Sequence, residues 1–134
     1  MAIDYGLARI GVAISDPLRI TARGLETINW NGRDMAWAQD RICELASEYE
    51  IVELVMGLPR RTDGQPSSSE TGARQLAADL EARLGLTVLF RDERYTTVLA
   101  SRVLNEVGYK KNKRQVIDQL AAEIILQDYL NASV

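Results

Sequence analysis

Residues 1–28 read MAIDYGLARIGVAISDPLRITARGLETI, and this stretch decides the fold. It contains three short segments rich in apolar or β-branched residues, which is typical of strands. Turn signals separate the segments at Gly6 and at Asp16-Pro17. The pattern therefore predicts an antiparallel meander of three strands, with the bounds Met1–Tyr5, Ala8–Ser15 and Thr21–Ile28.

Beyond the meander, the spacing of apolar residues predicts helices that alternate with strands. Asn31-Gly32 opens a helix whose apolar stripe is Met35, Ala38, Ile42, Leu45, Ala46 and Tyr49. A nearly continuous apolar run, typical of a strand buried on both faces, follows at Ile51–Met56. We expect a mobile loop over Arg60–Gly72, and then a helix at Ala73–Leu84, a strand at Leu86–Phe90, a helix at Thr96–Val107 and a last helix from about Lys113 to Leu130.

The order of these elements indicates an α/β fold. Strands that are joined through helices pair in parallel, whereas the opening meander is antiparallel. We therefore expect a mixed five-stranded sheet flanked by helices. The 134 residues suffice for a single domain over 1–134 that buries roughly two-thirds of its unfolded surface.

The chain has no histidine, and its one cysteine is Cys43. This composition excludes disulfide frameworks, zinc sites built from cysteine and histidine, and a histidine general base. Any metal must be held by oxygen, and carboxylate ligands favour hard ions such as Mg²⁺ or Mn²⁺. Cys43 falls on the apolar side of the first predicted helix, so we expect it to pack in the core.

Charge is distributed unevenly along the chain. The formal net charge of −3 argues against a protein that coats nucleic acid through overall positive charge. The chain's lysines nevertheless lie in one short basic stretch, together with an arginine: Lys110, Lys111, Lys113 and Arg114. No apolar run approaches the roughly 20 residues that cross a bilayer, and the start lacks a charged leader with an apolar signal core, so we expect a cytoplasmic protein.

Acids stand at three places where the pattern gives them a possible role. Asp118 shares the apolar face of the last predicted helix with Ala121, Ala122 and Ile125, whereas Gln115, Gln119, Glu123 and Gln127 line the opposite face. We therefore expect Asp118 to approach the sheet, where a carboxylate needs a cation, a hydrogen-bond network or a metal. Asp4 lies within the first strand, although acids are depleted in strands.

The third acid follows the strand Leu86–Phe90, at the end of the sheet where α/β proteins place their ligands. Periodicity does not choose between Asp92 and Glu93. Ordinary structural roles also remain open, with Asp4 as a turn-former, Glu93 as a partner of a neighbouring arginine, and Asp118 as a first-turn acid.

A family resemblance covers nearly the whole chain. It is carried by Ile3-Asp4-Tyr5-Gly6 with Arg9-Ile10-Gly11-Val12-Ala13 and Ser15-Asp16; by Gly57-Leu58-Pro59 with Asp63-Gly64; by Asp92-Glu93-Arg94-Tyr95-Thr96-Thr97; and by Lys111 to Arg114 followed by Asp118, Ala121-Ala122 and Ile125-Leu126-Gln127. In these stretches the sequence resembles the YqgF/RuvX family of the ribonuclease H-like superfamily. Its members are described as pre-16S rRNA nucleases and Holliday-junction resolvase-like proteins.

The resemblance implies a catalytic, metal-binding triad of Asp4, Glu93 and Asp118, and the choice of Glu93 over Asp92 rests on it alone. Two ions, Mg²⁺ or Mn²⁺, would then support hydrolysis of a phosphodiester bond. Gly6 would let the substrate backbone approach the first strand. Further candidates for substrate binding are Arg60, Arg61, Arg94, Thr96, Thr97, Lys110, Lys111, Lys113 and Arg114.

Several functions remain open within and beyond this family. A nuclease of this type would act on the 5′ region of precursor 16S rRNA or on a four-way DNA junction, and junction resolution by two symmetric cuts needs a homodimer instead of a monomer. A second class is an inactive nucleic-acid-binding module in ribosome assembly or transcription. A third, an actin-like or sugar-kinase-like ATPase, is suggested by Asp4-Tyr5-Gly6, but the chain is too short for a two-lobed nucleotide clamp.

Overall fold

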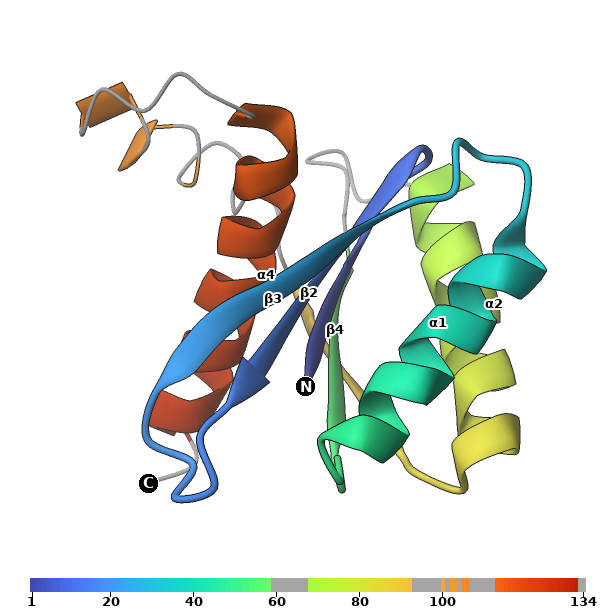
Figure 1. Cartoon of the computed structure of the whole chain (residues 1–134), viewed down its shortest axis with the longest axis horizontal. Helices are drawn as coiled ribbons and strands as arrows, with labels where there is room; N and C mark the ends of the chain where they lie inside the picture. Colours follow the sequence, from blue (N-terminus) through green and yellow to red (C-terminus); the bar gives the residue numbers. More distant parts are fainter. Residues whose placement is uncertain (59–67, 93–99, 101, 104, 107–112, 133–134) are drawn as a thin grey trace.

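The computed structural model describes residues 1–58, 68–92, 100, 102–103, 105–106 and 113–132. Within this part of the chain a β-sheet forms the middle layer (Figure 1). Helix α4 (Lys113–Ala132) covers one face of the sheet, and helices α1 (Met35–Glu48) and α2 (Ser68–Leu84) cover the other. The predicted α/β arrangement of a sheet flanked by helices is confirmed.

The described residues form a five-stranded sheet with the order β3-β2-β1-β4-β5. The strands are β1 (Ala2–Tyr5), β2 (Arg9–Ser15), β3 (Ala22–Asn29), β4 (Leu54–Leu58) and β5 (Val88–Asp92). The first three strands pair antiparallel, while β4 pairs in parallel with both β1 and β5. The predicted meander and the predicted parallel pairing are therefore both correct, and β1 lies at the centre of the sheet.

Alternation along the strands divides the buried side chains between two cores. Ile3, Ile10 and Met56 face the core that lies beneath α1 and α2. Small residues dominate the other face, where the strands contribute Ala2, Ala13, Ala22 and Val55 to a core with Ala122, Ile125, Leu126 and Leu130 of α4. Because the strand residues on this face are small, the backbone of α4 can lie close to the sheet.

Helix α1 begins at Met35, later than the predicted start at Asn31-Gly32. The side chain of Asp34 caps its start by accepting a hydrogen bond of 2.9 Å from the Trp37 amide. Of the predicted apolar stripe, Ala38, Ile42, Leu45 and Ala46 are buried, and Cys43 packs against the same core as expected. Tyr49 is an exception, because it caps the end of the helix and is 37% exposed.

The start of helix α2 differs from the prediction. The loop expected over Arg60–Gly72 lies outside the described residues up to position 67, but α2 already begins at Ser68. The serine, threonine and glycine content of this stretch suggested a loop. Serines and an acid also suit the first turn of a helix, and Glu70 forms an ion pair of 3.3 Å with Arg74 one turn later.

The two parallel strands also lie closer to the C-terminus than their apolar runs suggested. Ile51, the predicted start of β4, lies in the turn that follows α1, where its amide donates to the carbonyl of Ala46. Glu50 before it adopts a left-handed conformation with φ of 52°. β4 therefore begins at Leu54 and continues to Leu58, which is paired with Asp92 at the end of β5.

Helix α4 matches its predicted bounds closely. Of the helix expected at Thr96–Val107, the described residues 100, 102–103 and 105–106 are helical. No helix in the described part of the chain is both long enough and apolar enough to cross a membrane.

Candidate active site

Asp4 lies near the carboxyl end of the central strand β1. Its register partners are Gly11 on β2 and Gly57 on β4, so neither neighbouring strand places a side chain beside it. Its neighbours Ile3 and Tyr5 pack into the core beneath α1 and α2. By alternation the Asp4 side chain belongs to the opposite face, which is the face covered by α4.

Asp118 lies near the amino end of α4, on the same face of the sheet. Its carboxylate oxygen Oδ2 accepts a hydrogen bond of 2.7 Å from Nε of Arg9, which begins β2. The side chain of Asp118 is 16% exposed and that of Arg9 is 32% exposed. The sequence prediction that Asp118 approaches the sheet is therefore correct.

Gly11 brings the two acids into one region of the molecule. It pairs with Asp4 across the strands, and a Cβ atom at position 11 would overlap the main-chain carbonyl group of Asp118. The carboxyl end of β1 and the amino end of α4 lie at the same end of the sheet (Figure 1). Asp4 and Asp118, more than a hundred residues apart in sequence, thus share one face and one end of the sheet.

The environment of Asp118 disfavours an isolated negative charge. Burial raises the pKa of its carboxyl group above the ordinary value for aspartate, and the hydrogen bond and charge of Arg9 offset part of that increase. A partly buried carboxylate of this kind is stabilised by a nearby cation. In the described structure that cation is the guanidinium group of Arg9.

The glutamine face of α4 also forms hydrogen bonds with the sheet. Nε2 of Gln119 donates to the Thr27 hydroxyl at 3.2 Å, and Oε1 of Gln127 accepts from the Ala22 amide at 2.9 Å. Both contacts are to the edge strand β3. The helix therefore contacts the sheet with this face as well as with its apolar face.

Gly6 has a structural explanation in the turn that connects β1 with β2. A Cβ atom at position 6 would lie 2.5 Å from the Arg9 carbonyl oxygen, so the turn itself requires glycine. The Gly6 carbonyl also accepts a hydrogen bond of 3.0 Å from Nε1 of Trp30. Access of a substrate to Gly6 stays a prediction.

Most of the other predicted site residues lie outside the described residues: Arg60, Arg61, Glu93, Arg94, Thr96, Thr97, Lys110 and Lys111. Glu93 follows directly after Asp92, the last residue of β5. Lys113 and Arg114 form the start of α4, at the same end of the helix as Asp118. Among the described residues, no group of three or more acids, cysteines or histidines could hold a metal ion.

Arg9 is the residue of this region to which the sequence pattern gave no role. The pattern contains a signal for it, because Arg9, Gly11 and Ala13 share one face of β2 while the large apolar residues between them share the other. What alternation does not reveal is which helix covers that face.

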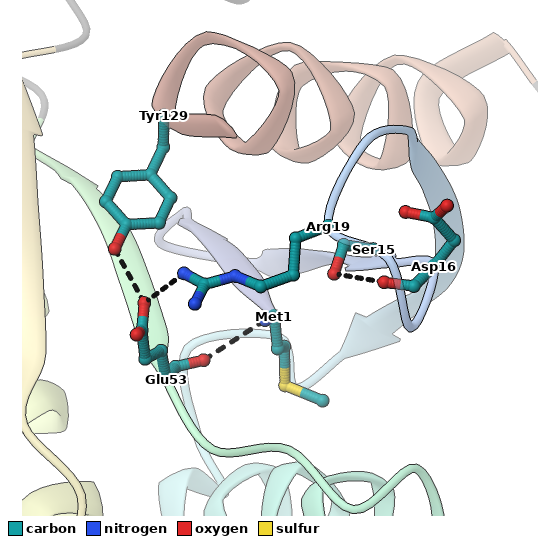
Figure 2. A network of polar contacts seen from close by, with 6 residues as sticks. All are labelled: Met1, Ser15, Asp16, Arg19, Glu53 and Tyr129. Carbon is teal, nitrogen blue, oxygen red and sulfur yellow. Dashed lines mark hydrogen bonds and ion pairs between the residues drawn. The ribbon is translucent and has the colours of Figure 1, made fainter. Parts of the chain in front are cut away.

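A pocket lies at the opposite end of the sheet, away from Asp4 and Asp118. Its lining includes Glu53, whose Oε2 accepts hydrogen bonds of 2.8 Å from Arg19 and 2.6 Å from the Tyr129 hydroxyl (Figure 2). The Met1 amino group donates to the Glu53 carbonyl at 3.1 Å. This network links the hairpin between β2 and β3 to β4 and to the end of α4, so its evident role is structural.

Relatives with similar sequences cover nearly the whole chain. A protein of Listeria monocytogenes serovar 1/2a named "Putative pre-16S rRNA nuclease" is 43% identical over 134 residues, which is 99% of this chain and 97% of the relative. A protein of Moorella thermoacetica with the same name is 47% identical over 132 residues, covering 98% of this chain and 93% of the relative.

Solved structures of the resolvase RuvC share the fold. The structure "T. thermophilus RuvC in complex with Holliday junction substrate" matches with a TM-score of 0.59 and 15% sequence identity, covering 98% of this chain and 92% of that one. A further Thermus thermophilus RuvC structure matches with a TM-score of 0.58 and 16% identity. The expected ribonuclease H-like fold is confirmed by this likeness.

A family model described as "RuvX: Holliday junction resolvase" matches residues 1–132. Together with the sequence identities above, this match confirms the family inferred from the motifs and supports the expected nuclease function. The chain belongs to the RuvX family.

Proposed function

We propose that this protein is a divalent-metal-dependent endonuclease that hydrolyses phosphodiester bonds in the 5′ maturation of precursor 16S rRNA in the cytoplasm. The names of the relatives from Listeria and Moorella support this substrate. The proposed catalytic and metal-binding residues are Asp4, Glu93 and Asp118.

One observation carries the proposal, namely the packing of Asp118 against Gly11 of β2, which is the register partner of Asp4. Gly11 separates the two residues, pairing with Asp4 on one side and contacting the Asp118 backbone on the other. β5 lies on the other side of Asp4, beyond β4, and ends one residue before Glu93. Chain connectivity is thus compatible with a third acid after β5, and the choice of Glu93 over Asp92 rests on the family resemblance.

The available donor atoms suit a hard divalent ion. The chain has no histidine, and the acids of the proposed site offer only oxygen ligands, which Mg²⁺ and Mn²⁺ prefer. The glycines that pair with Asp4 in the sheet add no side chains of their own beside it. Asp118 is partly buried and already requires a positive partner.

Asp4, Glu93 and Asp118 would hold the metal and fix its position relative to the sheet. When bound, a pair of divalent ions orients the attacking water and stabilises negative charge on the leaving oxygen. Arg9 holds the Asp118 carboxylate toward the sheet through its hydrogen bond. Asp4 on β1 and Asp118 on α4 supply the site with acids on rigid elements, which position ligands more accurately than loops do.

The basic residues would bind the substrate backbone on both sides of the cut. Lys113 and Arg114 begin α4, where the helix dipole also favours anions. Lys110 and Lys111 precede them in the chain, and Arg60, Arg61 and Arg94 add charge elsewhere. Contacts of this type confer affinity without sequence preference. Thr96 or Thr97 would add a hydroxyl contact to phosphate.

A second candidate function is cleavage of four-way DNA junctions by a homodimer. The description of the matching family and the likeness to the fold of RuvC favour it. The same acids would serve either substrate. The two functions differ in the oligomer that they require, because two symmetric cuts need two active sites.

A cleavage assay tests both functions with labelled precursor rRNA, generic single-stranded RNA and a synthetic four-way junction. Each substrate is incubated with Mn²⁺, with Mg²⁺ or with EDTA. The wild type is compared with Asp118→Asn, and Asp128→Asn serves as the matched control. Asp128 lies on the same helix, but it pairs with Arg91 and its side chain is 63% exposed.

We expect cleavage of precursor rRNA with metal, no cleavage in EDTA, and at least a hundredfold loss in Asp118→Asn with little change in Asp128→Asn. Cutting that persists in EDTA or survives Asp118→Asn would reject the mechanism. Preferential cutting of the junction by a dimer would favour the second function. If no substrate is cut, the protein is better described as a binding module.

A further inference from the structure

Arg9 donates a hydrogen bond to one of the carboxylate oxygens through which Asp118 would bind a metal ion. Its Nε atom donates to Oδ2 of Asp118 at 2.7 Å, and Asp118 is a proposed metal ligand. The two side chains come from β2 and α4, which are separated by most of the chain. Their contact is therefore a product of the fold and not of local sequence.

The ion pair between Arg9 and Asp118 is partly buried. The Asp118 side chain is largely shielded from water, whereas the Arg9 side chain is about one-third exposed. Removing one member of a partly buried ion pair leaves the other charge without compensation. Arg9 thus supplies positive charge beside the Asp118 carboxylate.

We propose that Arg9 is a resident counter-ion of Asp118, which holds the metal-free site in place and which a divalent ion must displace in order to bind. The inference rests on the proposed function, because it assumes that Asp118 is a metal ligand. Arg9 is accordingly a positioning residue, acting through Asp118.

Two opposite effects follow for a variant that lacks the charge of Arg9. The metal-free protein becomes less stable, since Asp118 loses its partner. Divalent ions bind more tightly, since no cation competes for Oδ2 and one repulsive charge is removed from the site. A residue with a purely structural role would weaken both properties when it is replaced.

The test measures Mn²⁺ binding by calorimetry and thermal unfolding with and without Mn²⁺. It compares the wild type with Arg9→Gln, with the charge-conserving Arg9→Lys and with Arg41→Gln. Arg41 is a matched control, because it forms an ion pair of 2.7 Å with Glu26 and its side chain has a similar exposure of 33%. Arg41 takes no part in the contact with Asp118, and Arg41→Gln lowers the net charge by the same amount as Arg9→Gln.

We expect Arg9→Gln to bind Mn²⁺ about tenfold more tightly than the wild type and to unfold at a lower temperature without metal. Arg9→Lys and Arg41→Gln should bind Mn²⁺ with nearly wild-type affinity. Because ligand binding stabilises the folded state, saturating Mn²⁺ should raise the unfolding temperature of Arg9→Gln more than that of the wild type.

Unchanged or weaker Mn²⁺ binding by Arg9→Gln would overturn the inference, as would equally tight binding by Arg9→Lys. Asp118→Asn separates this failure from failure of the proposed function. If the wild type binds Mn²⁺ and Asp118→Asn does not, the metal site stands whatever Arg9 does. If Asp118→Asn binds Mn²⁺ as the wild type does, the metal site and the role of Arg9 are both rejected.

Discussion

Gly11 on β2 and the main-chain carbonyl group of Asp118 on α4 are in direct contact, and a Cβ atom at position 11 would overlap that carbonyl. The absence of a side chain at Gly11 lets the start of α4 lie close to β2. Because the same helix residue carries a proposed metal ligand, packing at Gly11 and the geometry of the site depend on each other.

Gly11→Ala should displace the start of α4. Overpacking of this kind costs about 1–3 kcal/mol of the free energy of unfolding, and we expect a loss in that range by urea denaturation. Nuclease activity should fall more than stability suggests, because a small displacement of a catalytic group reduces rate strongly.

Gly24→Ala is the matched control for this change. An added Cβ atom there, between β3 and α4, would lie 3.0 Å from Cβ and 3.4 Å from the carbonyl oxygen of Gln119, so it would meet the helix without the overlap found at position 11. The control should therefore be milder in both stability and activity. Equal effects of the two substitutions would show that Gly11 has no special role at the site.

The sequence predicts the layers of this fold well and the ends of its elements less well. Strand alternation and turn signals in residues 1–28 predict the meander, and the apolar stripe of α1 is clear. The start of α2 at Ser68 is missed, because serine and glycine suit loops as well as first turns. A single domain over 1–134 stays a prediction.

For the candidate site, the sequence predicts the acidic residues more reliably than it predicts the residues that contact them. Asp118 is recognisable from its place beside Ala121 and Ala122 on the helix. Its ion pair with Arg9 depends on which face of the sheet α4 covers, and no local pattern encodes that choice. Glu93 lies outside the described residues, so its place in the triad stays a prediction.

Asp16 provides a prediction on pH. Its carboxylate accepts hydrogen bonds from the amides of Thr21 and Ile20, at 3.0 and 2.7 Å, and these bonds lower its pKa from the ordinary 3.8. A lowered pKa in the folded state means that the charged form stabilises the hairpin above the ordinary pKa. That contribution is lost as the pH falls through the folded-state pKa.

Asp16→Asn keeps the oxygen acceptor and removes the charge. We expect it to unfold at a lower temperature than the wild type at neutral pH, with a difference that closes as the pH falls below about 4. Glu48→Gln is the control for a general charge effect, because Glu48 is an exposed acid at the end of α1. A difference between Asp16→Asn and the wild type that is independent of pH would contradict the assignment.

Tyr129→Phe tests the network at the opposite end of the sheet. It removes the hydrogen bond of 2.6 Å to Glu53 while the bond from Arg19 to the same oxygen remains. We expect a loss of about 1 kcal/mol in the free energy of unfolding and unchanged cleavage. Tyr49→Phe is the control, because the contact of its ring with Arg23 survives the change. A large loss of cleavage in Tyr129→Phe would show that this end of the sheet takes part in activity.

The basic stretch that leads into α4 predicts how substrate binding depends on salt. Each phosphate contact that is lost reduces the slope of log affinity against log salt by about 0.7–0.9, so Lys111→Gln with Lys113→Gln should reduce it by about 1.5. Arg19→Gln with Arg83→Gln removes the same charge from ion pairs with Glu53 and Asp40, away from Asp118. Filter binding in EDTA would measure both slopes without cleavage. If the slope of log affinity against log salt falls equally in the two double variants, overall charge governs binding. If it falls only in the lysine variant, the phosphate backbone binds beside the start of α4.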